Sequence, residues 1–135
     1  MSPRFRFPPV PRTACLKLLD LQQVPFGAAA ALELAARAEE RGKTMKYFET
    51  SRHDGSRILC RIENFVPYHQ GFRQMITSRR MHQAVGELLG EPAVLFKDKI
   101  NFKLPGGDGF REHQDVQAGW SEYADIHITA MVAID

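Results

Sequence analysis

Residues 95–120 read LFKDKINFKLPGGDGFREHQDVQAGW and predict the central elements of the fold. Apolar and polar side chains alternate from residue 93 to residue 104, which predicts a long strand with two unlike faces. Residues 105–109, Pro-Gly-Gly-Asp-Gly, predict a turn. The next segment, residues 110–115, carries His113, Gln114 and Asp115. The stretch therefore predicts a strand, a glycine-rich turn and a short polar segment in succession.

His113 and Asp115 lie two positions apart. On an extended segment, side chains at i and i+2 point to the same face, so both could reach one metal ion. An imidazole and a carboxylate are two of the three ligands in the 2-His-1-carboxylate site of non-haem Fe(II) oxygenases. A distant histidine is then expected as the third ligand. A His-x-Asp triplet also arises by chance, and in that case both residues are ordinary surface residues.

The rest of the pattern predicts an α+β domain in which helices come first and strands follow. Helices are expected at residues 27–41, 67–77 and 78–90, and strands at residues 46–50, 57–63, 93–104 and 125–135. Ser78 is the expected N-cap and Gly90 the expected end of the third helix. In strand 57–63, Ile58, Cys60 and Ile62 should share one face, opposite Arg57, Leu59 and Arg61. Asp98 interrupts an apolar face and should have a partner, such as an arginine or a helix N-terminus.

The termini predict the domain organisation. Residues 1–14 are rich in proline and are expected to form a disordered or loosely docked arm. Residues 15–135 are expected to form the N-terminal part of a single domain. A sheet that stopped at residue 135 would leave an exposed edge strand, so a truncated domain is expected.

Size and composition exclude several classes of protein. A chain of 135 residues holds one domain at most, and 44% hydrophobic residues are enough for a packed core. The net charge of +2 and the absence of a long basic run argue against a nucleic-acid partner. No apolar run approaches the ~20 residues that span a membrane. Cys15 and Cys60 show no metal or disulfide spacing, which predicts a reduced, cytoplasmic protein.

The stretch 95–120 resembles the phytanoyl-CoA dioxygenase family of Fe(II)- and 2-oxoglutarate-dependent oxygenases. The shared pattern is a strand that ends near Asn101, a proline-glycine turn at residues 105–107, and the triplet from His113 to Asp115. Upstream, ILCRIENF at residues 58–65 is similar to the family segment with a basic cosubstrate contact. Downstream, HITAMVAID at residues 127–135 is similar to the strand after the motif.

The resemblance implies a double-stranded β-helix, or jelly roll, preceded by helices. It implies that His113 and Asp115 bind Fe(II), that 2-oxoglutarate is the cosubstrate, and that O₂ is consumed in hydroxylating a small molecule. The family's distal histidine and its 2-oxoglutarate arginine lie farther along than residue 135. His127 is too close to His113 to be that distal ligand and is expected to be a hydrogen-bonded strand histidine.

Several further side chains are candidates for the site. Arg61 could grip a carboxylate of 2-oxoglutarate bidentately. Lys97, Lys99 and Asn101 share one strand face, which either faces solvent or lines the cavity beside the cosubstrate and an anionic substrate, such as an aminoalkylphosphonate. The expected pocket residues are Gln114, Trp120, Thr129 and Met131.

The predicted function is that of a 2-oxoglutarate-dependent dioxygenase in the complete protein, whereas the 135 residues alone are expected to be inactive. Two alternatives stay open. One is a fragment or degenerate paralogue that acts as a metal-binding or interaction module. The other is a cupin-like metal protein that does not use 2-oxoglutarate. Composition and spacing leave the substrate and the oligomeric state undetermined.

Overall fold

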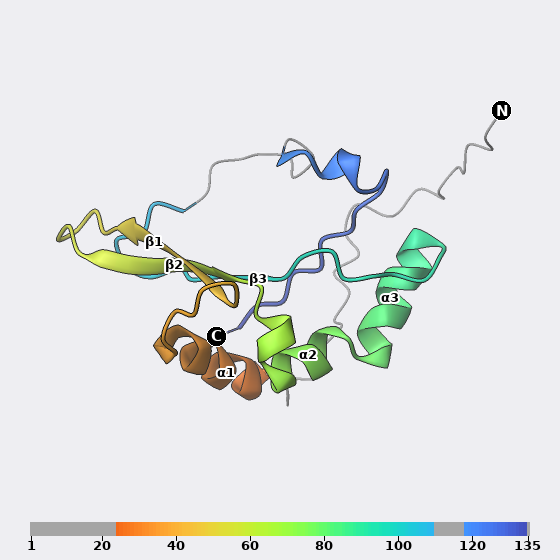
Figure 1. The fold of residues 1–135 in the computed structure, drawn as a ribbon, viewed down its shortest axis with the longest axis horizontal. Coiled ribbons are helices and arrows are strands. Elements are labelled where there is room, and N and C mark those ends of the chain that lie inside the picture. Colours follow the sequence, from red (N-terminus) through yellow and green to blue (C-terminus); the bar gives the residue numbers. More distant parts are fainter. Residues whose placement is uncertain (1–23, 110–117, 135) are drawn as a thin grey trace.

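The structure is a computed structural model and describes residues 24–109 and 118–134. Its elements are α1 (Val24–Ala36), β1 (Met45–Thr50), β2 (Arg57–Glu63), the 3₁₀ helix η2 (Val66–Tyr68), α2 (Gln70–Ile76), α3 (Arg79–Leu89), β3 (Lys99–Asn101) and the 3₁₀ helix η4 (Trp120–Glu122). The mixture confirms the α+β class. Along the chain, β1 and β2 lie between α1 and α2, as the predicted ranges had them, so the prediction that helices come first and strands follow is wrong (Figure 1). The arm predicted at residues 1–14 lies outside the described residues.

The sheet has three strands in the order β1-β2-β3, and both pairs are antiparallel. The bounds predicted for β2 are confirmed. Between β1 and β2 the register shifts, so that Tyr47 pairs with Arg61 and Phe48 with Leu59, which leaves Cys60 as an extra residue. This bulge reverses the alternation, and Leu59 packs on the same core as Ile62. The predicted division of the strand into two faces is therefore wrong at Leu59 and Cys60.

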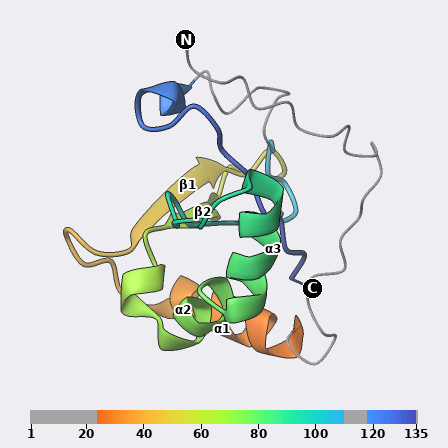
Figure 2. The same ribbon diagram turned by 90° about the vertical axis from the view of Figure 1, so that its right-hand side faces the viewer.

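Helices α1 and α2 pack on one face of the sheet, as Figures 1 and 2 show. Four large side chains are almost completely buried: Leu34 of α1, Ile62 of β2, Phe65 just before η2 and Phe72 of α2. The rings of Phe65 and Phe72 meet edge to face with their centroids 4.9 Å apart. Burial of each such side chain stabilises the fold by about 1.5–3 kcal/mol. The apolar face of the sheet is thus the one that the helices cover.

The helix ends follow from local chemistry. Helix α1 ends at Ala36, five residues before its predicted end, and the Lys46 ammonium of β1 donates hydrogen bonds to the carbonyl oxygens of Ala35 and Arg37. A cation at a helix C-terminus supplies hydrogen bonds to the last carbonyl oxygens and interacts favourably with the helix dipole. The predicted caps of α3 are confirmed: Ser78 Oγ accepts from the Met81 N–H at 3.2 Å, and Gly90 is left-handed with φ 78°. No helix among the described residues is long and apolar enough to cross a membrane.

The long strands predicted at residues 93–104 and 125–135 are not formed in the described residues. Only Lys99–Asn101 pairs, opposite Glu63, Ile62 and Arg61, and residues 125–134 hold no strand. The reason lies in β2, because Asn64 has a φ of +56° and turns the chain away from the sheet. Strand β3 therefore has no partner residue beyond Glu63.

Asp98 has the partner that its position predicts. Its two carboxylate oxygens accept hydrogen bonds from the N–H groups of Phe65, at 3.3 Å, and Val66, at 2.8 Å. These amides lie at the start of η2, so a buried carboxylate is matched to the positive end of a short helix. The contact fixes the segment before β3 against the end of β2.

Candidate functional site

The glycine-rich turn at residues 105–109 is docked on the β1–β2 hairpin. The Gly106 carbonyl oxygen accepts from the Arg52 N–H at 2.9 Å, and the Asp108 N–H donates to Glu49 Oε2 at 3.1 Å. Gly106 has a φ of +84°, and a Cβ atom there would lie 2.4 Å from Ser51 Oγ, so only glycine fits. The hairpin thereby fixes where the next segment, which contains His113, begins.

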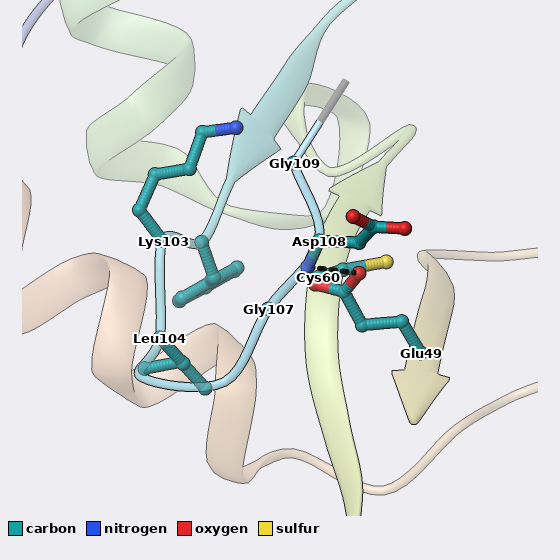
Figure 3. A pocket seen from close by; sticks show the side chains of 8 residues that line it. Glu49, Cys60, Lys103, Leu104, Gly107, Asp108 and Gly109 are labelled. Atoms are coloured by element: carbon teal, nitrogen blue, oxygen red, sulfur yellow. Dashed lines mark hydrogen bonds between the residues drawn. The ribbon is translucent and has the colours of Figure 1, made fainter. Parts of the chain in front are cut away.

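A cavity of about 180 Å³ lies beside this turn (Figure 3). It is lined by Glu49, Cys60, Phe102, Lys103, Leu104, Gly107, Asp108 and Gly109. Figure 3 shows the Lys103 side chain on a different wall from the carboxylates of Glu49 and Asp108. Cys60, the bulged residue, reaches the cavity and donates from its thiol to the Tyr47 carbonyl at 3.4 Å. The cavity therefore has one cationic and two anionic side chains in its wall. Its lining includes Gly109, the residue that precedes the predicted metal-binding segment in the sequence.

A second polar group lies on the sheet itself, and we call Tyr47, Arg61, Glu63 and Lys97 the Glu63 cluster. Glu63 Oε1 is 3.1 Å from both Arg61 Nε and Lys97 Nζ. Glu63 Oε2 accepts from the Tyr47 hydroxyl at 3.3 Å. The Arg61 guanidinium carbon lies 4.4 Å from the centre of the Tyr47 ring, in cation–π geometry. One carboxylate thus joins two cations and a phenol.

Burial within the Glu63 cluster is uneven. The Glu63 side chain is 5% exposed, whereas those of Arg61 and Lys97 are 29% and 39% exposed. A buried carboxylate is stable only when it is paired, and two cations meet that need. With one negative and two positive charges, the cluster has a formal charge of +1 and presents its cations outward. Such an arrangement suits the binding of an anion.

Four predicted cosubstrate residues lie together on this face of the sheet. Arg61 and Lys97 share Glu63, Asn101 pairs with Arg61 in the ladder, and the exposed Lys99 pairs with Glu63. The sequence analysis missed Glu63 and Tyr47. A signal for Glu63 was available, because it follows Arg61 by two residues in a strand and so shares its face. Tyr47 depended on the register between β1 and β2, which the bulge sets.

The predicted pocket residues that the structure describes are Trp120, Thr129 and Met131, and their surroundings differ. Trp120 packs on Phe96 and His127, with ring centroids 5.4 Å and 5.6 Å away. Met131 is 91% exposed, and Thr129 is also exposed. His127 is not in a strand, and its Nε2 is buried without a hydrogen-bond partner among the described residues. The prediction that its hydrogen bonds are satisfied is therefore wrong for that atom, and ring packing accounts for its position.

The predicted iron ligands His113 and Asp115, and their neighbour Gln114, lie outside the described residues. In the described part of the chain, no group of three or more His, Cys, Asp or Glu side chains could hold a metal ion. The roles of His113 and Asp115 remain predictions.

The chain is similar to curated oxygenases. It is 52% identical over 103 residues to the 2-aminoethylphosphonate dioxygenase of uncultured bacterium HF130_AEPn_1, which covers 76% of this chain and 39% of that protein. It is 40% identical over 103 residues to the methylphosphonate hydroxylase of Gimesia maris, with 76% and 38% covered. It is 32% identical over 76 residues to the probable alpha-ketoglutarate-dependent hypophosphite dioxygenase of Stutzerimonas stutzeri, with 56% and 25% covered.

This chain is a homologue of dioxygenases. The similarity bears out the dioxygenase part of the resemblance and includes a relative named as alpha-ketoglutarate-dependent. The chain spans about two fifths of the length of the first two relatives. No family model matches it, and neither does a solved structure.

Proposed function

We propose that the complete protein is an Fe(II)- and 2-oxoglutarate-dependent dioxygenase of the phytanoyl-CoA dioxygenase family that hydroxylates a small organophosphonate. The observation that carries the proposal is the 52% identity to a protein named 2-aminoethylphosphonate dioxygenase. The methylphosphonate hydroxylase at 40% identity supports the same class of substrate. The three-stranded sheet, with helices on one face, would form the first part of a jelly roll.

The iron site would use His113 and Asp115. A neutral imidazole and a carboxylate suit Fe(II), and residues i and i+2 of an extended segment can reach one ion. Iron with bound 2-oxoglutarate would supply the oxidising chemistry for C–H hydroxylation. The chain's own part is to orient these two ligands, and the docked turn before them, centred on Gly106, would do so.

The anionic reactants would be held by the cationic face of the sheet. 2-Oxoglutarate is a dianion, and a phosphonate carries one or two negative charges. Arg61 would bind a carboxylate of the cosubstrate, with Asn101 beside it and Lys97 and Lys99 adding positive charge. Lys103, on one wall of the 180 Å³ cavity, would meet a phosphonate, and Glu49 would meet an amine. Asp108, which also pairs with Arg52, would add negative charge beside Glu49.

The test measures substrate-dependent succinate formation by the protein at its native length, with Fe(II), 2-oxoglutarate and O₂. We expect 2-aminoethylphosphonate to stimulate succinate formation well above its sulfonate analogue, taurine. We expect His113→Ala to abolish turnover and the matched variant His82→Ala, on the exposed face of α3, to retain it. Equal stimulation by taurine would contradict a phosphonate substrate. Full turnover by His113→Ala would contradict the iron assignment.

A further inference from the structure

We infer that Glu63 and Tyr47 are positioning residues, which hold Arg61 and Lys97 in place before an anionic cosubstrate binds. The inference rests on the proposed role of Arg61 and Lys97 in binding 2-oxoglutarate. Its new content is that an anion on the protein improves the binding of an anionic ligand.

The geometry of Glu63 is that of an anchor. Its Oε1 atom lies 3.1 Å from Arg61 Nε and 3.1 Å from Lys97 Nζ, so one oxygen fixes two cationic side chains from different segments. Arg61 belongs to β2, whereas Lys97 lies before β3. Because the Glu63 side chain is buried, its position is set by packing. The two cationic side chains therefore pair with a carboxylate that has a fixed position.

Tyr47 fixes the remaining freedom of Arg61. Its ring lies 4.4 Å from the guanidinium carbon, and its hydroxyl donates to Glu63 Oε2 at 3.3 Å. The guanidinium therefore has a carboxylate oxygen at ion-pair distance from Nε and an aromatic ring 4.4 Å from its carbon. These two contacts define the direction in which the guanidinium can meet a carboxylate, and bidentate recognition depends on that direction.

Preorganisation explains why a counter-charge would help binding. An arginine or lysine side chain loses about 2 kcal/mol of rotamer entropy when it is immobilised. If Glu63 and Tyr47 have already immobilised Arg61 and Lys97 in the folded protein, the ligand does not bear this cost. A stability role alone explains the cluster less well, because apolar residues of similar volume can replace a buried ion pair without loss of stability.

Charge alone and positioning predict opposite changes in the affinity for 2-oxoglutarate when Glu63 is replaced by glutamine. This substitution removes one negative charge beside two cations, so electrostatics alone would make the binding of a dianion tighter. Loss of positioning would make it weaker. We expect the Kd for 2-oxoglutarate to rise on the order of tenfold, which is less than the rotamer entropy of one fully immobilised arginine or lysine side chain would account for.

The experiment is calorimetric titration of 2-oxoglutarate into the native-length protein loaded with Ni(II) as a redox-inactive metal. The variants are Glu63→Gln, Tyr47→Leu, which removes the ring and the hydroxyl, and Tyr47→Phe, which keeps the ring. Glu40→Gln is the matched control, because Glu40 also pairs with a lysine, Lys43, but on the exposed surface. In steady-state assays, we expect Glu63→Gln to raise the KM for 2-oxoglutarate and to leave kcat within about threefold.

The outcomes separate the two levels of the proposal. Weaker binding by Glu63→Gln and Tyr47→Leu, with partial recovery in Tyr47→Phe and no change in Glu40→Gln, supports the positioning role. Unchanged or tighter binding by Glu63→Gln, at a temperature where the variant is folded by circular dichroism, overturns it. Failure of the unsubstituted protein to bind 2-oxoglutarate overturns the proposed function, and the positioning role with it.

Discussion

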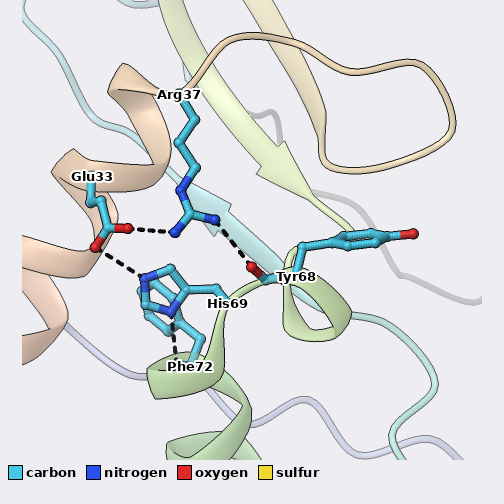
Figure 4. Close-up of polar contacts among 5 residues, drawn as sticks. All are labelled: Glu33, Arg37, Tyr68, His69 and Phe72. Carbon is cyan, nitrogen blue, oxygen red and sulfur yellow. Dashed lines mark hydrogen bonds and ion pairs between the residues drawn. The ribbon is translucent and has the colours of Figure 1, made fainter.

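Two polar networks in this chain are built in opposite ways. In the Glu63 cluster the carboxylate is buried and the cations are partly exposed. In the network between α1 and α2, shown in Figure 4, the buried member is the imidazole of His69 and the carboxylate of Glu33 is exposed. The buried group is the one that the surrounding fold holds most firmly. The more exposed group is the one that a ligand or solvent can reach.

The contacts of the helix network are structural. His69 Nδ1 accepts from the Phe72 N–H at 3.2 Å and caps α2, while Nε2 lies 3.5 Å from Glu33 Oε2. Arg37 pairs with Glu33 and donates to the Tyr68 carbonyl at 3.1 Å. These contacts join α1 to α2 and the segment before it. We therefore propose that the helix network stabilises the fold and that the Glu63 cluster binds a ligand.

The largest expected effect is on cosubstrate use by Arg61→Ala. Loss of a bidentate contact to a carboxylate should lower kcat/KM for 2-oxoglutarate by on the order of 10²-fold. Arg61→Lys should recover only part of this, because an ammonium group cannot bind bidentately. Arg57→Ala is the matched control, since Arg57 lies on the same strand and stacks on Phe48. An equal loss of kcat/KM in Arg57→Ala would mean that the effect comes from the whole strand and not from the Glu63 cluster.

The next effect belongs to the helix network. His69→Ala removes the cap of α2 and a buried ring that packs 5.0 Å from Phe72, so the free energy of unfolding should fall by about 2 kcal/mol. The affinity for 2-oxoglutarate should stay unchanged. His69→Asn should recover part of the stability, because asparagine is a good N-cap. Urea denaturation measures the stability. A large change in cosubstrate affinity would show that the two networks are not separate.

The sequence predicted local elements better than pairing. The bounds of β2 and the caps Ser78 and Gly90 depend on short-range chemistry, and the structure confirms them. The need of Asp98 for a partner was also predicted, but which amides meet it depends on tertiary contacts with Phe65 and Val66. Of the strand expected at residues 93–104, only Lys99–Asn101 forms. The residues before Lys99 have no partner, because β2 stops at Glu63. An alternating pattern reports that one side of a segment is buried, but it does not report whether a ladder exists there.

The same limit applies to the site. Lys97, Lys99 and Asn101 were predicted to share one strand face and Arg61 was predicted separately, and the ladder between β2 and β3 is what brings Arg61 to that face. Glu63 was missed because a buried acid indicates a binding site only once its partners are known. Tyr47 was missed because its place beside Arg61 depends on the register between β1 and β2. The bulge at Cys60 sets which residue of β1 faces Arg61, and no residue type in β2 marks it. Tertiary pairing therefore carries the information that the residue pattern lacked.

The smallest expected effect is the pH dependence of the helix network. The hydrogen bond from Arg37 lowers the pKa of Glu33 below its ordinary value of 4.5, with smaller contributions from the charges of Arg37 and His69. A carboxylate with a lowered pKa in the folded state adds stability above pH 4.5, and that stability is lost as the pH falls through the lowered pKa. Thermal unfolding of the unsubstituted protein and of Glu33→Gln should therefore differ slightly near neutral pH and converge in acid. Because Glu33 is exposed, the difference should be small and should shrink further in high salt.

Glu63→Gln should act on a different property, since its main effect is on ligand affinity. If Glu33→Gln changed the affinity for 2-oxoglutarate as much as Glu63→Gln did, the assignment of one network to stability and the other to binding would be wrong.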